Sequence, residues 1–522
     1  MPERLKRLAQ HLVPELPFGA SASTEFIEVS APASTAASLY EKIRNSLEYQ
    51  EEHLLRRNAI LRILKRFVGT HSTLESTAGN LLRELVWAKY LPNKVVPVTF
   101  VQRIAPVLAK YEPLLKAAEA SGPEQDFLFH FVLDVLATEI EYTLQPPNVD
   151  EALASFMYEE MKTRTEWDPT LAISEEDRDL RFYVAVHRAL LKSTPATLRF
   201  RLFTLYYPTW KETTADDPLV AEIAGSLSTV VSAIEGHIHH PLTERLTRLL
   251  RRRAGIIRVL GDVLKGAKEE TYEDPETLDH AVAEALDLRT KEFRVRLRRT
   301  VVRAIIFLVI TKMFLALLLE VPYDALFFQG KAPLYPLFIN ILFHPAFLAV
   351  LSLTVKIPQK QNAEDYKSAI RALSVGADHP ALHIRVRRET RGRRQVVFDT
   401  IYGVLFLAVY GAIGYGLHAG GFHLLSVALF LFFISLVTFF AIRIRTSTRD
   451  IVASDSRSGL FGTIFDTLLL PIVRVGAWLS VKVSKINVFI YFFDFIIEAP
   501  LKVAIQFIEG WLAFVREKRE EI

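Results

Sequence analysis

The 522-residue chain contains no cysteine. This absence excludes disulfide bonds, cysteine-ligated zinc, iron–sulfur clusters and thiol catalysis. Any metal site would need histidine and carboxylate ligands. The cluster formed by Glu235, His237, His239 and His240 is such a candidate. Its spacing matches no known catalytic pattern and Pro241 follows at once, so we interpret it as a solvated loop and expect no metal site.

The chain also lacks the short motifs that carry common enzymatic chemistry. We find no GxxxxGK[ST], GxGxxG, GxSxG or HExxH sequence and no calcium-binding loop of the EF-hand type. An enzymatic function therefore has no residues to support it. We expect no catalytic residue and no cofactor.

The N-terminus lacks the apolar core of a secretory signal. Residues 21–39 are rich in serine, alanine and threonine and have little to bury. We predict that residues 1–38 form a flexible tether.

The chain is rich in apolar residues: half of its residues are hydrophobic, and 35 are phenylalanine. Lysine and arginine number 63 against 59 acidic residues, so the net charge favours no class of partner. This composition is more apolar than a soluble protein of this length needs, and it indicates a membrane component.

The first part of the chain has the punctuation of an all-α domain. Amphipathic segments follow one another and are separated by the breakers LPNKVVP, LQPPN, YYPTW and HHPLT. Two helix starts carry caps, at Ser174 with Asp177 three residues later and at Asp274 before Pro275. We predict a cytosolic α-helical domain over residues 39–299.

Four later segments are long and apolar enough to cross about 30 Å of hydrocarbon. They cover residues 301–319, 335–355, 400–417 and 422–442. We predict one transmembrane hairpin over 300–356 and a second over 398–443, joined by a basic cytosolic loop over 357–397. The predicted fold class is a polytopic, all-α membrane protein.

Basic residues gather on one side of these spans, whereas the two loops on the other side contain one lysine between them. By the positive-inside rule, we predict a cell-membrane protein whose N-terminal domain, 357–397 loop and C-terminus lie on the cytoplasmic side. We expect contacts with anionic lipid headgroups from two arginine clusters: Arg294, Arg296, Arg298, Arg299, and Arg385, Arg387, Arg388, Arg391, Arg393, Arg394. Nucleic acid is disfavoured as a partner because no aromatic residues are interleaved with the second cluster.

Residues 444–522 contain two further apolar stretches interrupted by charges. On a helix, Asp494, Glu498, Lys502, Gln506 and Glu509 fall on one narrow stripe. We predict juxtamembrane amphipathic helices for 460–516, because a third hairpin would bury Asp466, Arg474, Asp494 and Glu498. That hairpin stays the alternative, as does packing of both helices on the cytosolic domain.

The first hairpin contains a candidate intramembrane polar site. Lys312 lies near the middle of the first span, His344 lies at a similar depth in the second, and Asn340 is a further polar residue of the second span. An ionisable group at the bilayer midplane is a hypothesis of function, because its desolvation must be offset by a partner or by water. The structural alternative is that Lys312 snorkels to the interface and His344 meets a carbonyl freed by Pro345.

Small residues recur at four-residue steps in the third span, at Ala408, Ala412 and Gly416. Such a stripe lets another helix approach closely. It could form a homo-oligomer, but the short turn that follows favours packing against the fourth span.

These patterns support two functions. The first is a membrane-anchored scaffold that presents its cytosolic helical domain to a protein partner. The second is a transporter or channel that uses Lys312, Asn340 and His344.

Overall fold

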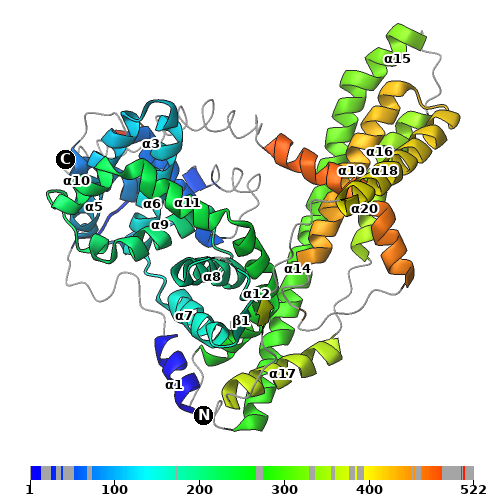
Figure 1. The fold of residues 1–522 in the computed structure, drawn as a ribbon. Helices are drawn as coiled ribbons and strands as arrows, with labels where there is room; N and C mark the ends of the chain where they lie inside the picture. Colours follow the sequence, from blue (N-terminus) through cyan, green and yellow to red (C-terminus); the bar gives the residue numbers. More distant parts are fainter. Residues whose placement is uncertain are drawn as a thin grey trace. The chain divides into compact units, whose positions relative to one another are not determined.

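The computed structural model describes most of the chain as α-helix (Figure 1). The described ranges are 2–12, 25–30, 52–67, 73–171, 173–265, 274–328, 335–353, 359–375, 382–384, 393–447 and 460–484, together with the single residues 34, 37, 38, 41, 452, 507, 510 and 511. The chain divides into two compact units. We call Gln10–Thr163, Ala172–Leu250 and Asn487–Ile522 the helical unit, and Met1–Ala9, Arg164–Leu171 and Arg251–Ile486 the span-bearing unit.

The helical unit is built from consecutive helices joined by short connections. Its α-helices are α3 (Glu52–Phe67), α4 (Leu74–Trp87), α5 (Phe100–Glu119), α6 (Gln125–Leu144), α7 (Asn148–Lys162), α8 (Glu175–Leu190), α9 (Pro195–Tyr206), α10 (Pro218–Gly225) and α11 (Leu227–Ile238). Single turns of 3₁₀-helix stand at Gly122–Glu124 (η1) and Pro208–Lys211 (η2). The predicted breakers all fall at or beside helix ends.

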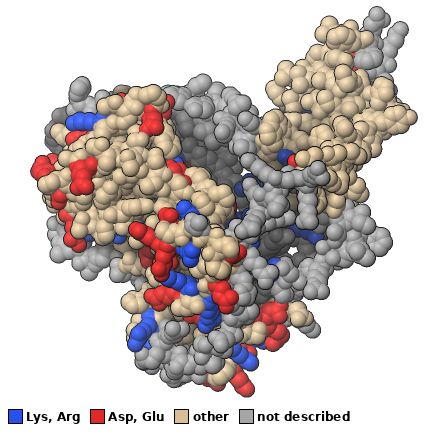
Figure 2. All heavy atoms as spheres, in the orientation of Figure 1, with Lys and Arg blue, Asp and Glu red and all other residues tan. Residues whose placement is uncertain are grey.

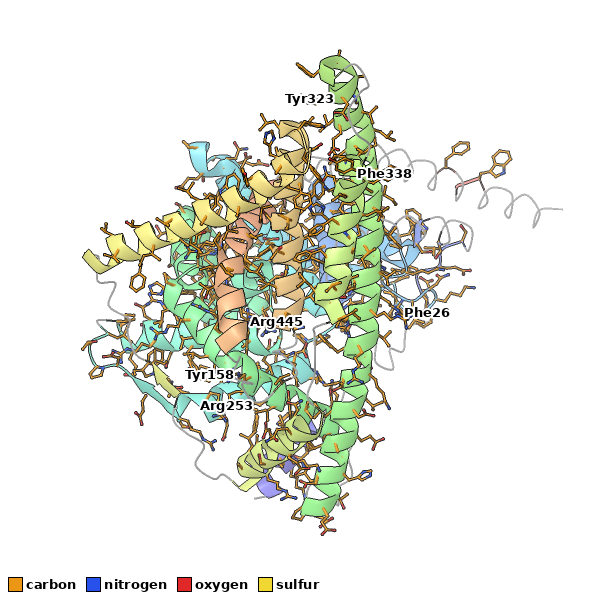
Figure 3. All side chains as sticks on the ribbon, turned by 90° about the vertical axis from the view of Figure 1, so that its right-hand side faces the viewer. Phe26, Tyr158, Arg253, Tyr323, Phe338 and Arg445 are labelled. Atoms are coloured by element: carbon orange, nitrogen blue, oxygen red, sulfur yellow. The ribbon has the colours of Figure 1, made fainter. Side chains whose placement is uncertain are left out.

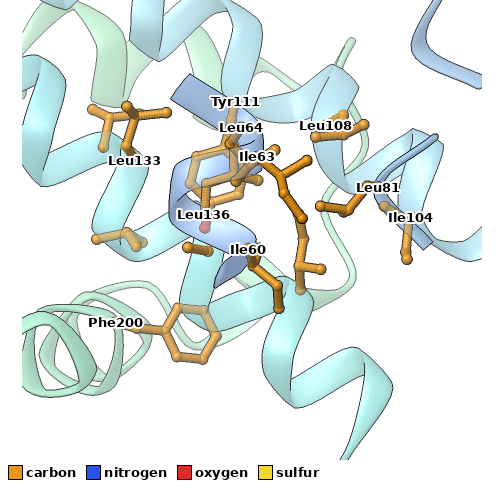
Figure 4. Close-up of a cluster of buried hydrophobic side chains, with 14 of the residues drawn as sticks. Ile60, Ile63, Leu64, Leu81, Ile104, Leu108, Tyr111, Leu133, Leu136 and Phe200 are labelled. Atoms are coloured by element: carbon orange, nitrogen blue, oxygen red, sulfur yellow. The ribbon is translucent and has the colours of Figure 1, made fainter. Parts of the chain in front are cut away.

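The core of this unit gathers the apolar faces of α3, α4, α5, α6, α9, α10 and α11. Figure 4 shows its centre, where Ile60 and Leu64 of α3 lie among Leu81, Tyr111 and Leu136. The helical spacing of Ile60, Leu61 and Leu64 places Ile60 and Leu64 inside, as amphipathic packing requires.

A buried ion pair runs through the same core. The Lys110 amine lies 2.5 Å from the Glu139 carboxylate and donates a 2.9 Å hydrogen bond to the Trp210 carbonyl oxygen. The Tyr111 hydroxyl and the Trp210 indole N–H both donate to the second Glu139 oxygen, at 2.6 and 2.9 Å. Burial and the neighbouring Glu139 charge raise the pKa of Tyr111 well above its usual value. The network satisfies the carboxylate fully, which is the condition for a stable buried charge.

Both predicted helix caps are confirmed. The Ser174 hydroxyl accepts a 3.1 Å hydrogen bond from the Asp177 backbone N–H at the start of α8. The Asp274 carboxylate accepts a 2.9 Å hydrogen bond from the Thr277 N–H at the start of α14 (Pro275–Leu315). Hydrogen bonds from Thr277 lower the pKa of Asp274.

The described N-terminal residues differ from the predicted tether. Residues Pro2–His11 form helix α1, and Leu5, Leu8 and Leu12 are buried. Residues 25–30 run beside 93–98, where the Ile27 N–H donates to the Val96 carbonyl at 2.9 Å. Helix α1 is fixed by its buried leucines, and residues 25–30 are fixed by these backbone hydrogen bonds, although residues 21–39 have few large apolar side chains to bury.

The span-bearing unit contains α14, the π-helical segment η3 (Ala316–Glu320), α15 (Val321–Phe328), α16 (Tyr335–Leu353), α17 (Gln359–Val375), α18 (Arg393–Ala419), α19 (Leu424–Ser447) and α20 (Leu460–Ser484). Helix α12 (Pro241–Leu264) starts in the helical unit and ends in this one. The short strands β1 (Thr165–Trp167) and β2 (Leu382–Ile384) pair in parallel, with Glu166 opposite His383. Helix α17 packs on the N-terminal part of α14, where Arg371 forms an ion pair with Asp279.

Four helices in the described chain are long and apolar enough to cross a membrane, which confirms the predicted number of spans. They are Pro275–Phe327, Tyr335–Leu353, Val396–Ala419 and Leu424–Arg445. Figure 2 shows that the face of α15, α16, α18 and α19 turned to the viewer carries almost no charged side chains. Helices α10 and α11 are also long and apolar enough when they are counted as one helix. They bend by 74°, however, and their buried apolar residues belong to the core of the helical unit.

The first span is longer than predicted. The helix does not stop at residue 319 but continues through η3 and α15 to Phe328. Residues 320–328, interpreted from the sequence as part of a loop, are therefore helical. The continuation places Glu320 and Asp324 on the same rod as Lys312 (Figure 3, where Tyr323 marks its far end).

Helix α20 packs along α19 and also contacts α18. Ile472 is buried, and the Arg474 guanidinium lies 4.5 Å from the centre of the Tyr402 ring of α18. The apolar part of α20, Thr467–Ser480, is shorter than the four spans. The polar stripe Asp494, Glu498, Lys502, Gln506 and Glu509 lies outside the described residues.

The expected contact of the α18 small residues with the fourth span is wrong. Ala408, Ala412 and Gly416 are exposed, and nothing lies within 4 Å of a side chain added at Gly416. The side of α18 that meets α19 carries Ile413, Gly414 and Leu417 instead. The reason is angular, because four-residue steps keep 408, 412 and 416 on a single face, and the contact uses another one.

Candidate functional site

The site is centred on Lys312, which the long helix α14 places inside the bundle of spans. The Lys312 side chain is only 3% exposed. Its amine donates a hydrogen bond to the Asn340 side-chain oxygen on α16 and lies 4.3 Å from the centre of the Phe433 ring on α19. Lys312 thus has a direct partner inside the protein, and it does not snorkel to the interface.

Asn340 links this amine to a carboxylate that the sequence analysis missed. The Asn340 amide nitrogen donates to one oxygen of Glu320, and both residues are buried. The other Glu320 oxygen has no hydrogen-bond partner in the part of the chain that the structure describes. Two opposite charges are therefore bridged by one neutral amide, and one carboxylate oxygen keeps a free lone pair.

The π-helical turn η3 brings Glu320 to this position. Eight residues of regular α-helix would leave Glu320 about 80° around the helix from Lys312. A π-helical turn is wider, so each residue advances by a smaller angle. Glu320 is the last residue of η3, and it therefore faces the same side of the rod as Lys312. Such insertions occur often at functional sites.

His344 supports the site through the backbone of α16. Its Nδ1 atom lies 3.2 Å from the Asn340 carbonyl oxygen, and its Nε2 atom lies 3.0 Å from the Phe430 carbonyl oxygen on α19. The residue is fully buried. The carbonyl that Pro345 deprives of a partner belongs to Ile341, so the expected contact differs by one residue. His344 holds α16 to α19 and positions Asn340.

A second group of polar side chains continues from Glu320. The Ser426 hydroxyl of α19 faces the Glu320 carboxylate and lies 2.9 Å from Nε2 of His423. The same His423 nitrogen lies 2.8 Å from the Asp324 carboxylate of α15. The Tyr323 ring lies against the His423 ring, with 4.9 Å between their centres.

The six side chains form one continuous row, which we call the polar row: Lys312, Asn340, Glu320, Ser426, His423 and Asp324. The sequence analysis found Lys312 and Asn340, and the structure brings His344 beside them. It missed the other four because Glu320 and Asp324 were assigned to a loop and His423 to the start of the fourth span. A helical reading of residues 320–328 would have placed Glu320 and Asp324 four residues apart on one face.

The predicted lipid-contact arginines are only partly described. Arg294, Arg296, Arg298 and Arg299 are exposed on α14, next to the first apolar turns of the span. Arg393 and Arg394 lie in the first turn of α18. Arg385, Arg387, Arg388 and Arg391 lie outside the described residues.

The histidine cluster is not the solvated loop predicted from the sequence, because Glu235 and His237 lie in helix α11 and His237 is buried. The His237 Nε2 atom lies 3.0 Å from the Tyr206 hydroxyl, and His239 lies 3.1 Å from the Glu235 carboxylate. The His240 ring accepts a hydrogen bond from the Leu242 backbone N–H. Among the described residues, no three histidine or acidic side chains are arranged to hold a metal ion.

Comparisons with known proteins do not assign the chain to a family. No family model, curated protein or solved structure matches it.

Proposed function

We propose that the span-bearing unit moves protons across a membrane through the polar row. The observation that carries this proposal is the bridge Lys312–Asn340–Glu320, which holds two ionisable side chains about 3% exposed among apolar helices. A charge in the middle of a bilayer is costly, so side chains of this kind usually mark an ion or proton path.

The geometry suits a proton better than a larger cation. Lys312 and Glu320 can each bind or release a proton, and the Asn340 amide keeps them apart, so they do not form a closed ion pair. One Glu320 oxygen stays free to receive a proton. A metal cation would need several oxygen ligands at one point, whereas the described residues offer a linear row.

The test is proton flux through the full-length protein in liposomes that contain a trapped pH dye, driven by a potassium diffusion potential. We expect wild-type protein to acidify or alkalinise the lumen according to the sign of the potential. The variants Lys312→Leu and Glu320→Gln should reduce the flux to that of protein-free liposomes. The matched control is Lys291→Leu, which removes an exposed lysine from the same helix and should leave the flux unchanged.

A purely structural ion pair would give a different pattern. Removing one charge leaves its partner buried and destabilises the fold, whereas replacing both charges with apolar side chains is often neutral. We therefore include Lys312→Leu with Glu320→Leu. We expect the double variant to insert and melt like wild type but to conduct no protons. Flux at the wild-type rate in this variant would rule out the proposal.

The orientation belongs to the same proposal. The exposed arginines of α14 support a cytoplasmic position for the N-terminal end of the first span, by the positive-inside rule. With an even number of spans, we propose that both chain ends lie on the cytoplasmic side of a cell membrane.

A second candidate function is a membrane-anchored scaffold. It is favoured by the helical unit, which has its own extensive core independent of the spans. Chemical cross-linking of the full-length protein in cells tests it. The scaffold function predicts cross-links from a cytosolic protein to the helical unit that persist in the flux-deficient double variant. Cross-links confined to lipids would contradict it.

A further inference from the structure

We infer that the polar row opens toward the non-cytoplasmic side and that an apolar cluster closes its cytoplasmic side. This inference rests on the proposed function and adds the side from which the proton enters, the entry residues and the position of the barrier. It assigns Asp324, His423 and Ser426 as proton-entry residues.

The exposure of the side chains along the polar row gives the first argument. At its outer end the side chains of Asp324 and His423 are 23% and 12% exposed. Ser426, Glu320, Asn340 and Lys312 are all buried. The row therefore has one end within reach of water, and Lys312 is its inner end.

The outer end lies at the loop side of both hairpins. Asp324 stands at the C-terminal end of the rod that begins with α14, and His423 stands in the turn between α18 and α19. The same turn is fixed to the other hairpin, because the Tyr335 hydroxyl donates a 2.8 Å hydrogen bond to the Gly420 carbonyl. The exposed arginines 294, 296, 298 and 299 lie toward the N-terminal end of the apolar span, away from Tyr323, which marks the outer end of the rod in Figure 3.

The hydrogen bonds around His423 indicate which ring nitrogen carries the proton. Its Nδ1 atom accepts a 3.3 Å hydrogen bond from the Ser426 backbone N–H, so this atom carries no proton. The Nε2 atom faces both the Asp324 carboxylate and the Ser426 hydroxyl. Nε2 therefore carries the ring proton, and it is the atom that can pass a proton to Ser426.

The transfer can be written with every proton accounted for. His423 binds a proton from water at Nδ1, in place of the 3.3 Å hydrogen bond from the Ser426 N–H, and the Asp324 carboxylate, 2.8 Å from Nε2, stabilises the imidazolium. The imidazolium releases its Nε2 proton to the Ser426 oxygen while Ser426 passes its own hydroxyl proton to the Glu320 carboxylate, and His423 is left neutral with its proton on Nδ1. The net result is one proton moved from water to Glu320. Among the described residues, Tyr323 against the His423 ring and His344 beside Asn340 are further titratable groups that face the row.

On the other side of Lys312 the polar row ends at apolar side chains. Leu308, one turn before Lys312 on α14, packs with Leu348, Phe433, Val437 and Ala441. Ala304, Ile305 and Leu351 cover this cluster further toward the arginine end. The cluster is apolar, so we expect it to block proton transfer beyond Lys312 until these helices separate.

The absence of native cysteine makes the test direct, because an introduced thiol is the only one in the protein. Single variants Asp324→Cys, Ser426→Cys, Leu308→Cys and Val437→Cys are made in the full-length chain. Each is exposed to a charged, membrane-impermeant methanethiosulfonate, once on intact cells and once on inside-out vesicles. Leu424→Cys, which is 80% exposed beside His423, and Arg298→Cys report the outer and the inner side.

We expect Asp324→Cys to react from the side of Leu424→Cys, and Ser426→Cys to react more slowly from that same side. Leu308→Cys and Val437→Cys should react from neither side. Reaction of Ser426→Cys from the side of Arg298→Cys, or reaction of Val437→Cys as fast as the controls, would overturn the inference. Leu424→Cys reacting only in inside-out vesicles would also overturn it, because the entry side would then be cytoplasmic.

The outcome is separable from that of the proposed function, since thiol access needs no proton flux. If the variants are labelled as expected but the protein conducts no protons, the inferred access pathway stands and the proposed function is rejected. Variants that fail to fold are identified by their melting temperature, and Ser426→Cys, which is nearly isosteric with wild type, keeps the entry side testable in that case.

Discussion

At the scale of single residues, Gly476 sets how closely α20 approaches α19. A side-chain carbon added at this position would overlap the Ser435 carbonyl oxygen and would lie 2.7 Å from the Phe439 Cβ atom. Backbone atoms cannot move away as a flexible side chain can. The two helices therefore touch here through their backbones, in the manner of small-residue contacts in membranes.

We predict that Gly476→Ala destabilises the packing of α20 on α19 by about 1–3 kcal/mol, the usual cost of overfilling a packed site. The matched control is Gly411→Ala on α18, where nothing lies within 4 Å of the added carbon. There the substitution should stabilise the helix by about 0.5–1 kcal/mol. Thermal unfolding of both variants in detergent measures the difference, and equal melting temperatures would contradict the close contact.

The candidate site illustrates what single residues reveal before the structure is known. Lys312 and Asn340 could be found from sequence because ionisable and amide side chains are rare in apolar spans. Glu320 and Asp324 could not, since a carboxylate next to a predicted loop is an ordinary observation. Their assignment depended on the helix continuing through η3, which no residue type in that segment dictates.

At the scale of elements, α14 joins two environments in one helix of 41 residues, about 60 Å long. Its first half packs against α12 and α17 through the Arg289–Asp262 and Arg371–Asp279 ion pairs. Its second half carries exposed apolar residues such as Ile306, Phe307 and Phe314. Between the halves stand the exposed arginines 294, 296, 298 and 299, where a lipid headgroup layer would lie.

We predict that anionic lipid stabilises the protein through this arginine band. Each cation near such a surface contributes on the order of 1 kcal/mol. Changing all four arginines to glutamine should remove most of the rise in melting temperature that phosphatidylserine or phosphatidylglycerol produces in mixed micelles. The control replaces four exposed cations of the helical unit, Arg83, Lys89, Lys116 and Lys211, with glutamine.

That control should retain the full lipid effect if the arginine band is the contact. An equal loss in both variants would mean that the lipid effect follows overall charge and not the position of α14.

At the scale of the whole molecule, the stability of the helical unit should depend on pH through a buried histidine. Burial, and then the nearby Arg201 charge, lower the pKa of His187 well below its usual value, while its ring packs 4.2 Å from Tyr183. The folded state thus keeps His187 neutral, whereas the unfolded chain protonates it below about pH 6.5. The contribution of His187 to the free energy of unfolding is therefore fully present above that pH. It decreases as the pH falls, by about 1.4 kcal/mol per pH unit.

We predict that His187→Phe, which keeps a planar ring at this position, reduces the pH dependence of the unfolding free energy by the contribution of one proton. Burial also lowers the pKa values of His237 and His240, so part of the slope should persist. His239→Gln changes an exposed histidine and should leave the slope intact. Urea unfolding of the full-length protein between pH 7 and pH 5, followed by tryptophan fluorescence, measures both. An unchanged slope in His187→Phe would show that His187 is protonated in the folded state.

The sequence by itself determined the all-α class, the four apolar segments long enough to span a membrane, and several helix ends. These features follow from local physics: apolar length fixes a span, and Ser174 and Asp274 cap the helices that follow them. Each depends on residues that are close together in the chain, so a periodic pattern is enough to predict it.

Only the tertiary structure decided which polar residues meet. Glu320 reaches Lys312 through an amide on another helix, and His423 reaches Asp324 across about 100 residues of chain. The exposed stripe of Ala408, Ala412 and Gly416 was likewise decided by which face of α18 packs on α19. Such pairings depend on the rotation of each helix about its axis, and that rotation is set by packing against its neighbours.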